Sequence, residues 1–291
     1  MPPKSRPSPP PKPKSLSSQP STSISQTRIP PETGKRGLCW PWDQPGSHFK
    51  LFEQYVSMPG KIRWLFNWEL WVPDSLQPDM EWIPCVRTAA QAKDIDPFLT
   101  DILRTRKASA LLGFNEPEIP EQANLNVEAA VALWKDVVLP AKAKFGLRLG
   151  SPGMSSDVGR SKPWLTSFLA QLGGNDGIDF LVLHWYGPRF TDMRAFLEDM
   201  HQTYRLPVWL NEFACSKMGN GETDVDEVSA FLREALPWLD ACPWIERYAY
   251  FGHKDVGSWV GRASNFSEPV EGDGTSEARK LTRVAQLYCE Y

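Results

Sequence analysis

The chain has 291 residues, which allows one large domain or two small ones. Its hydrophobic share of 41% and its net charge of −3 are ordinary for a soluble globular protein, and they argue against a basic nucleic-acid-binding protein. No apolar run approaches the roughly 18 residues that span a bilayer, so we expect no membrane partner. The composition stands out for 13 Trp, 14 Phe and 7 Tyr, and we expect some of these rings to line a binding surface.

The first 31 residues contain ten Pro, eight Ser and five basic residues, with no acidic and no aromatic residue. Such a segment buries too little apolar surface to offset the entropy lost on ordering. We therefore predict a disordered, partly polyproline-like tail over residues 1–34 and a folded domain over residues 35–291. We favour a solvated leader or linker. The alternatives are a basic arm that contacts a cell wall and a ligand of the SH3-binding type. The tail lacks the apolar stretch of a secretory signal, so either the chain is not exported by that route or a signal has been removed.

Eight short apolar runs follow the tail, and their β-forming residues predict eight strands. They are Arg36–Trp40, Lys61–Asn67, Trp82–Val86, Ala108–Phe114, Leu147–Gly150, Ile178–His184, Pro207–Leu210 and Arg247–Phe251. Segments with helical spacing lie between most of them. These are Asp94–Arg104, Asn126–Lys144, Trp164–Leu172, Met193–Tyr204, Val225–Leu239 and Glu277–Leu287. Residues 71–81 are broken by proline, and we expect a loop there. The alternation of strand and helix over about 250 residues predicts a single-domain α/β fold, a (β/α)8 TIM barrel.

Catalytic residues of such barrels lie at the carboxyl ends of the strands. Here most of these positions carry aromatic residues, amides and carboxylates, while Ser151 follows the fifth strand. The sequence contains no Gly-rich phosphate-binding loop, and its four histidines form no HExxH or HxH pair. We therefore expect neither a nucleotide cofactor nor a metal.

Glu116 and Glu212 stand just after the fourth and seventh predicted strands. These strands lie on opposite sides of an eight-stranded barrel, so the two carboxyl groups would face each other across its mouth. Cleavage of a glycosidic bond needs such a pair, whereas the alternative for either Glu alone is a strand-end ion pair with an arginine. Strand alternation predicts that Glu116 shares a face with Phe114, so that Asn115 reaches the site only if the chain turns there. It also predicts that Trp209 points toward the helices.

The sequence Leu112–Pro117 (LGFNEP) resembles the fourth-strand acid/base motif of clan A glycoside hydrolases, and Trp209–Phe213 (WLNEF) resembles their nucleophile motif. Further matching pieces follow in chain order. They are Gly37–Trp42, Phe66–Trp68, Gly150–Pro152, His184–Gly187 and Arg247–Phe251. From about residue 35 to the end, the chain resembles glycoside hydrolase family 128, the fungal glycosyl hydrolase catalytic core group of β-1,3-glucanases.

This resemblance implies a retaining β-1,3-glucanase, endo- or exo-acting, with Glu116 as the acid/base and Glu212 as the nucleophile. It implies that Asn115 contacts the sugar hydroxyl beside the reacting carbon, and that His184 or Tyr186 contacts the carboxylates. The other substrate-binding candidates are Asn67, Trp42, Trp68, Trp185, Phe251 and Trp259, of which Phe251 stands where many clan A enzymes have Trp. The implied partner is β-1,3-glucan or its laminari-oligosaccharides. The implied protein is a monomer, secreted or associated with the cell wall.

Two alternatives stay open, because the family also contains members that bind oligosaccharides with little hydrolysis. The first is a β-1,3-glucan oligosaccharide-binding protein on the same barrel, and the second is a hydrolase of another β-glucan, mannan or xylan. The five cysteines cannot all pair with one another. Cys242 and Cys289 would meet if the last helix packs beside the eighth strand, whereas Cys39 and Cys85 are expected to be buried thiols.

Overall fold

The computed structural model describes residues 34–41, 43–56, 61–73, 75–106, 108–175, 177–270 and 278–291. The tail predicted over residues 1–34 therefore lies outside the described residues, except for its last one. So does Trp42, which the sequence offered as a sugar-binding residue.

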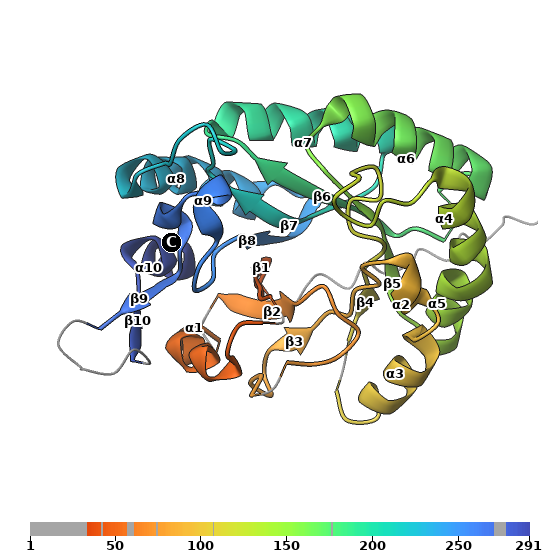
Figure 1. Ribbon diagram of the computed structural model, residues 1–291, viewed down its shortest axis with the longest axis horizontal. Helices are drawn as coiled ribbons and strands as arrows, with labels where there is room; N and C mark the ends of the chain where they lie inside the picture. The colour runs from red at the N-terminus through yellow and green to blue at the C-terminus, as the bar shows by residue number, and fades with distance from the viewer. Residues whose placement is uncertain are drawn as a thin grey trace, which may run out of the picture. The chain divides into compact units, whose positions relative to one another are not determined.

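Eight parallel strands form one sheet in the order β3-β2-β1-β8-β7-β6-β5-β4 (Figure 1). They are β1 (Arg36–Cys39), β2 (Ile62–Phe66), β3 (Glu81–Trp82), β4 (Ala110–Leu111), β5 (Arg148–Met154), β6 (Phe180–Tyr186), β7 (Val208–Ala214) and β8 (Ile245–Tyr250). Each overlaps one of the eight predicted runs, so the strand prediction is confirmed. The carboxyl ends differ, because β5 and β7 each continue four residues beyond their predicted ends.

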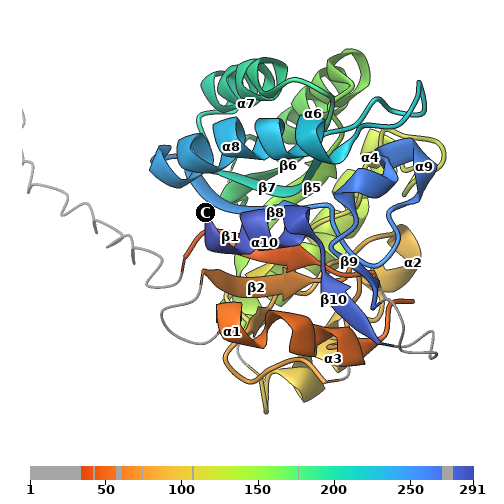
Figure 2. The same ribbon diagram turned by 90° about the vertical axis from the view of Figure 1, so that its left-hand side faces the viewer.

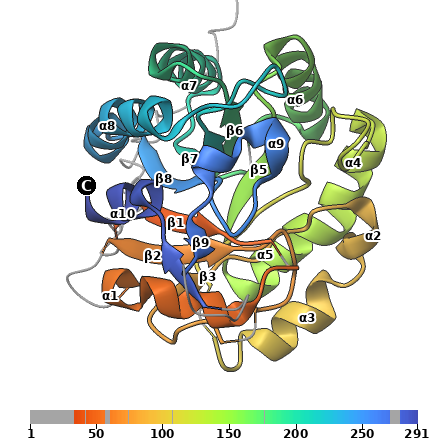
Figure 3. The same cartoon turned by 60° about the vertical axis from the view of Figure 1, so that its left-hand side comes forward.

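Helices follow most of the strands and, apart from the short α9 at the carboxyl-end face, lie outside the curl of the sheet (Figure 3). They are η1 (Gly46–Phe52), α1 (Glu53–Val56), α2 (Ala89–Ala92), α3 (Ile95–Ile102), α4 (Val127–Leu133), η2 (Trp134–Val138), α5 (Leu139–Phe145), α6 (Val158–Leu172), α7 (Phe190–Tyr204), α8 (Val225–Ala241), α9 (Gly257–Val260), η3 (Arg262–Ser264) and α10 (Arg283–Glu290). The proline-broken segment between β2 and β3 has no helix in its described residues. None of the helices in the described ranges is long and apolar enough to cross a membrane.

The starts of two helices differ most from the prediction. Helix α6 begins at Val158 because the Asp157 side chain accepts a hydrogen bond of 3.1 Å from the N–H of Gly159 and caps the first turn. The last helix was predicted over Glu277–Leu287, but α10 begins only at Arg283. Before it, β10 (Arg279–Leu281) pairs antiparallel with β9 (Ser267–Pro269).

The two edge strands of the sheet, β3 and β4, continue into segments that bond to each other. Cys85 and Leu112 form a parallel bridge. The N–H of Leu112 donates to the carbonyl of Pro84 at 2.9 Å, and the N–H of Val86 donates to the carbonyl of Leu112 at 3.0 Å. The sheet is therefore curled, and the segments that follow its two edge strands are bonded to each other.

Apolar side chains fill both faces of the sheet. The outer layer joins the strands to the helices, and the inner layer lies inside the curl. The inner layer consists of Cys39, Trp64, Phe66, Ile83, Cys85, Ala110, Leu112, Phe180, Val182, Trp209 and Ala249.

Trp209 lies in this inner layer, so the prediction that it points toward the helices was wrong. Its ring is buried and stacks on Phe180 at 4.0 Å. The register of β7 against β8 shifts between Leu210 and Phe213, which marks an irregularity of the β-bulge kind. An extra residue there interrupts the alternation, so that both Trp209 and Glu212 point to the inside while Phe213 packs outward.

Helix α10 packs beside β1 and β8 (Figure 2), where the hydroxyl of Tyr288 donates to the carbonyl of Gly37 at 2.8 Å. Despite this packing, Cys242 and Cys289 are both free thiols, so they do not form the pair that the sequence allowed. The other three cysteines are free and buried as well, which confirms the prediction for Cys39 and Cys85.

Candidate active site

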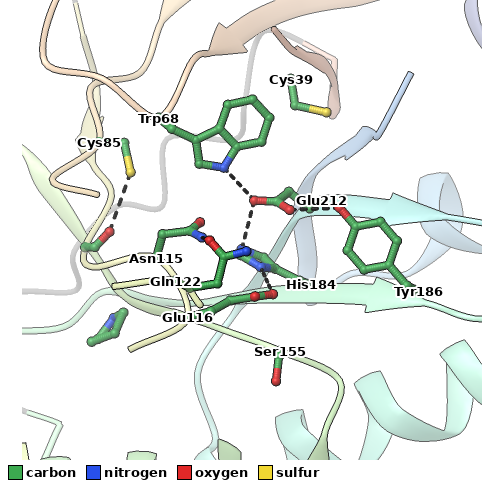
Figure 4. Close-up of polar contacts among 12 residues, drawn as sticks. Cys39, Trp68, Cys85, Asn115, Glu116, Gln122, Ser155, His184, Tyr186 and Glu212 are labelled. Atoms are coloured by element: carbon green, nitrogen blue, oxygen red, sulfur yellow. Dashed lines mark hydrogen bonds and ion pairs between the residues drawn. The ribbon is translucent and has the colours of Figure 1, made fainter. Parts of the chain in front are cut away.

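A cavity of about 890 Å³ lies at the carboxyl ends of the strands. Every strand contributes a lining residue near its carboxyl end, within the strand or in the segment that follows it. In order from β1 to β8 these are Pro41, Trp68, Arg87, Glu116, Ser155, Tyr186, Glu212 and Phe251. The structure therefore brings the two predicted catalytic residues, Glu116 and Glu212, into one cavity (Figure 4).

Glu212 is held at both carboxylate oxygens. It points inward from the bulged part of β7 and is only 6% exposed. The indole Nε1 of Trp68 donates to its Oε1 at 2.7 Å, and the hydroxyl of Tyr186 donates to its Oε2 at 2.9 Å. These two hydrogen bonds fix the orientation of the Glu212 carboxylate, which lines the cavity.

Glu116 reaches the cavity through a turn of the backbone. Its φ of +42° lies in the left-handed region, which costs a non-glycine residue about 1–2 kcal/mol. Phe114 packs outward on Trp134 at 5.7 Å, so the prediction that Glu116 and Phe114 share a face was wrong. Asn115 was expected to reach the site only if the chain turns here. The turn is present, and both Asn115 and Glu116 line the cavity.

His184 lies between the two carboxylates. Its Nδ1 is 2.7 Å from Oε1 of Glu116, and its Nε2 is 3.4 Å from Oε1 of Glu212. Burial lowers the pKa of this imidazole, but the charges of Glu212 and Glu116 outweigh burial and raise the pKa of His184 to about 9. At neutral pH the ring is therefore a buried cation, which is hydrogen-bonded to Glu116 through Nδ1 and ion-paired with Glu212 on the Nε2 side, where it makes no hydrogen bond.

Burial also sets the protonation of the groups around Glu212. It raises the pKa of Glu212 above its usual range, and the positive charge of His184 opposes this rise. Burial and the charge of Glu212 raise the pKa of Tyr186 well above its usual range. Tyr186 therefore stays a neutral hydrogen-bond donor over the whole physiological range.

Among the described residues, five aromatic side chains line the cavity, and all five were predicted from the sequence. They are Trp68, Trp185, Tyr186, Phe251 and Trp259. Trp259 is 50% exposed, and its ring meets that of Tyr186 at 5.0 Å in an edge-on arrangement. Sugar rings pack their apolar faces on such surfaces, so this lining suits a carbohydrate.

Asn115 and Asn67, both predicted to bind substrate, have different surroundings. The amide of Asn115 lines the cavity and donates to Oε1 of Gln122 at 3.2 Å. Asn67 is completely buried and does not line the cavity. Its Nδ2 donates to the carbonyl of Trp71 at 2.9 Å, and its Oδ1 accepts from Nε1 of Trp82 at 3.2 Å. These bonds make Asn67 a support of the segment after β2.

The sequence missed some cavity residues because it ended strand β5 too early. Ser151 is buried inside this strand, and its Oγ accepts from the N–H of Val182 at 2.9 Å. The serine that follows the strand is Ser155, which lines the cavity together with Ser156. No signal in the sequence pointed to the hydrogen bond between Trp68 and Glu212. Among the residues that the structure describes, no group of His, Cys, Asp and Glu is placed to hold a metal ion.

Comparisons with known proteins agree on one family. A family model described as glycosyl hydrolase catalytic core matches residues 37–288. The solved structure of a GH128 subgroup III curdlan-specific exo-β-1,3-glucanase from Blastomyces gilchristii, in complex with glucose, is similar at 30% identity with a TM-score of 0.69. The match covers 88% of this chain and 98% of that one.

Two further relatives are more distant. A GH128 subgroup VII oligosaccharide-binding protein from Trichoderma gamsii shares the fold at 22% identity and a TM-score of 0.67, over 91% of this chain and 96% of its own. Alkali-sensitive linkage protein 1 of Schizosaccharomyces pombe is 28% identical over 260 residues, or 88% of this chain. That match spans 44% of the length of the S. pombe protein.

Proposed function

The chain belongs to the glycosyl hydrolase catalytic core family, glycoside hydrolase family 128, and from this premise we propose that it hydrolyses β-1,3-glucan with retention of the anomeric configuration. Glu212 is the nucleophile and Glu116 is the acid/base. One observation carries the proposal: two cavity-lining glutamates, from the fourth and seventh strands, face opposite nitrogens of one buried imidazole. The B. gilchristii exo-β-1,3-glucanase supports the choice of substrate.

The reaction runs as a double displacement. In the first step, the carboxylate of Glu212 attacks the anomeric carbon, and Glu116 gives its proton to the departing glycosidic oxygen. In the second step, Glu116 takes a proton from water, and this water displaces Glu212 from the sugar. Trp68 and Tyr186 orient the attacking carboxylate through their hydrogen bonds to it.

The test is hydrolysis of laminari-oligosaccharides, followed through new reducing ends. We expect Glu212→Gln and Glu116→Gln to lower kcat by at least about 100-fold, because each removes an acid–base or nucleophilic role, while oligosaccharide binding in calorimetry persists. Azide is expected to restore turnover to Glu116→Gln on substrates with good leaving groups, since azide needs no general base. The matched control is Asp136→Asn, which neutralises an exposed carboxylate on η2. Parental activity in Glu212→Gln would overturn the assignment.

A binding protein with little turnover is the second candidate, and one observation favours it. The cationic His184 donates to Glu116 and pairs best with a charged carboxylate, whereas a general acid must carry a proton. If the parent binds laminari-oligosaccharides but releases no reducing ends from pH 4 to 8, this second function replaces the first. Release from mannan or xylan but not from β-1,3-glucan would instead change the substrate.

We propose that the eight strands close into a (β/α)8 barrel, supported by the bridge between Cys85 and Leu112. We also propose a monomer that acts on glucan outside the cell or in its wall, in line with the family resemblance. Size-exclusion chromatography with light scattering tests the monomer, and fractionation of the source cells tests the location.

A further inference from the structure

A third carboxylate, Glu118, lies beside the two proposed catalytic glutamates and has no part in their mechanism. Its Oε1 accepts a hydrogen bond of 2.8 Å from the N–H of Ser155. Its Oε2 is buried and has no hydrogen-bond partner in the described structure. Glu118 is half-buried, and an unbonded carboxylate oxygen away from water is costly, so its contact with Ser155 calls for a reason.

That contact continues the pairing of β4 with β5 beyond the end of β4. The N–H of Gly153 donates to the carbonyl of Phe114 at 2.7 Å, and the N–H of Glu116 donates to the carbonyl of Gly153 at 2.8 Å. Backbone pairing stops there, because Pro117 has no N–H and Glu116 has turned into the left-handed region. The next connection to the β5 segment is the side chain of Glu118.

We propose that Glu118 is a positioning residue, which holds the strained turn at Glu116 against the end of β5 so that the Glu116 carboxyl group faces the scissile bond. This inference rests on the proposed function of Glu116 as the acid/base. The same contact fixes Ser155, which lines the cavity, relative to Glu116. The contact therefore keeps the distance between the Glu116 turn and the Ser155 segment constant.

The charge of Glu118 also acts on its neighbours. The titratable groups around it are Glu116, from the turn after β4, and His184 on β6, with Glu212 on the far side of that imidazole. Burial raises the pKa of Glu118, and the charge of Glu116 adds to the rise. In turn, the negative charge of Glu118 contributes to the raised pKa of His184.

Two substitutions separate the hydrogen bond from the charge. Glu118→Gln keeps an oxygen that accepts from Ser155 but removes the charge, whereas Glu118→Ala removes both. We expect Glu118→Ala to lower kcat by about 10- to 100-fold with KM little changed, as a misplaced catalytic group does, and Glu118→Gln to recover most of that loss. Because both variants remove the charge, both are expected to lower the pKa of His184 in an NMR titration.

Amide hydrogen exchange at Ser155 and Glu116 tests the geometry without any hydrolysis. We expect faster exchange in Glu118→Ala and near-parental exchange in Glu118→Gln and in the surface control Asp136→Asn. If the parent itself does not hydrolyse glucan, the proposed function fails, and amide exchange still decides whether Glu118 holds the turn. The inference is overturned if Glu118→Ala exchanges like the parent at both amides, or if Glu118→Gln loses as much kcat as Glu118→Ala.

Discussion

The indole Nε1 of Trp68 donates a hydrogen bond of 2.7 Å to Oε1 of Glu212, a residue 144 positions away in the sequence. Trp68 has a φ of +58°, so the chain reverses its bend just after β2 and brings the ring over the inner face of the sheet. There the ring lies between Phe66 at 4.6 Å and Phe251 at 5.9 Å. Trp68, which the sequence offered as a sugar-binding residue, thus also donates a hydrogen bond that orients the carboxylate of the proposed nucleophile.

The substitution Trp68→Phe keeps an aromatic ring but removes the donor. Hydrogen bonds to a charged group contribute about 1.5–3 kcal/mol, so we expect kcat/KM to fall by about 10- to 100-fold. The hydrogen bond from Trp68 lowers the pKa of Glu212, so its loss raises that pKa. Because the nucleophile must be ionised, the acidic limb of the pH–activity profile is expected to move to higher pH.

The control for this change is Trp238→Phe, the same substitution on α8 away from the cavity, where the ring packs against Phe190 at 5.8 Å. We expect it to leave the pH profile in place. A Trp68→Phe enzyme whose acidic limb coincides with that of the parent would show that the indole N–H does not tune Glu212.

Gly153 leaves the space that His184 occupies. A Cβ at this position would lie 2.8 Å from Nε2 and 3.2 Å from Cε1 of the imidazole. Gly153→Ala is therefore expected to displace His184 from between the two carboxylates and to lower kcat by at least about 10-fold. Overpacking of this kind costs about 1–3 kcal/mol of unfolding free energy.

Urea denaturation and steady-state kinetics measure the two effects of Gly153→Ala. Gly159→Ala in the first turn of α6 is the matched control, because its Cβ would meet only a side-chain oxygen of Asp157 at 3.3 Å. An active and stable Gly153→Ala enzyme would mean that His184 has room to move without consequence.

The sequence predicted the strands and the two glutamates because hydrophobic runs and short motifs are local signals. It failed where a single residue changes the alternation of a strand. The irregular register in β7 brings Trp209 inside together with Glu212, and the left-handed turn at Glu116 separates this residue from Phe114. The irregularity in β7 has no Gly or Pro to indicate it. At Glu116, the following Pro117 made a turn plausible but did not predict its left-handed conformation.

The polar partners were hardest to predict, since they depend on contacts between distant segments. Asn67 has the residue type and the strand-end position of a substrate ligand, yet both ends of its amide bond to Trp71 and Trp82. Whether such a side chain faces the cavity or supports the backbone depends on the packing of neighbouring side chains. The sequence carries no periodic signal for it.

The stereochemical outcome follows from the space between Glu116 and Glu212. If Glu212 attacks the sugar directly, the two carboxyl groups must stand about 5–5.5 Å apart, with no room for a water between sugar and nucleophile. We expect the first product seen by proton NMR to be the β-anomer, which then mutarotates. An α-anomer as first product would contradict the double displacement and require a water on the Glu212 side.

Two buried histidines are expected to shape the pH dependence of stability in opposite directions. Burial lowers the pKa of His253 to about 4, while Asp43 and Asp255 oppose this only in part. An unfolded histidine titrates near pH 6.5. Between pH 6.5 and 4 the unfolded chain therefore binds a proton that folded His253 does not bind, and the unfolding free energy decreases as the pH is lowered. For His184, with its pKa of about 9, the stabilisation is complete below pH 6.5 and is lost as pH rises through 9.

His253→Leu tests the acidic half of this behaviour. Both ring nitrogens of His253 lack hydrogen-bond partners among the described residues, so the change removes no bond. Between pH 6.5 and 4 we expect the parent to lose up to about 3 kcal/mol more unfolding free energy than the variant, measured by urea denaturation. The contribution of His184 is the same in both proteins and cancels. Parallel stability curves would show that folded His253 accepts its proton as readily as the unfolded chain does.

Trp259 offers the most exposed aromatic surface of the cavity, with half of its area open and its ring standing edge-on to Tyr186. A β-1,3-linked glucan is bent, so its rings need aromatic faces on several strand ends, such as Trp68 after β2, Trp185 on β6 and Trp259 after β8. Burial of one apolar sugar face at roughly 25 cal/mol per Å² corresponds to about 1–2 kcal/mol. Trp259→Ala is therefore expected to weaken laminari-oligosaccharide binding by about 5- to 30-fold in calorimetry without changing the melting temperature greatly.

Phe98→Ala, which removes a 40% exposed ring from α3 outside the cavity, is the control and should bind like the parent. Equal binding by Trp68→Ala, Trp185→Ala and Trp259→Ala would instead assign these rings to packing and would refute the aromatic site.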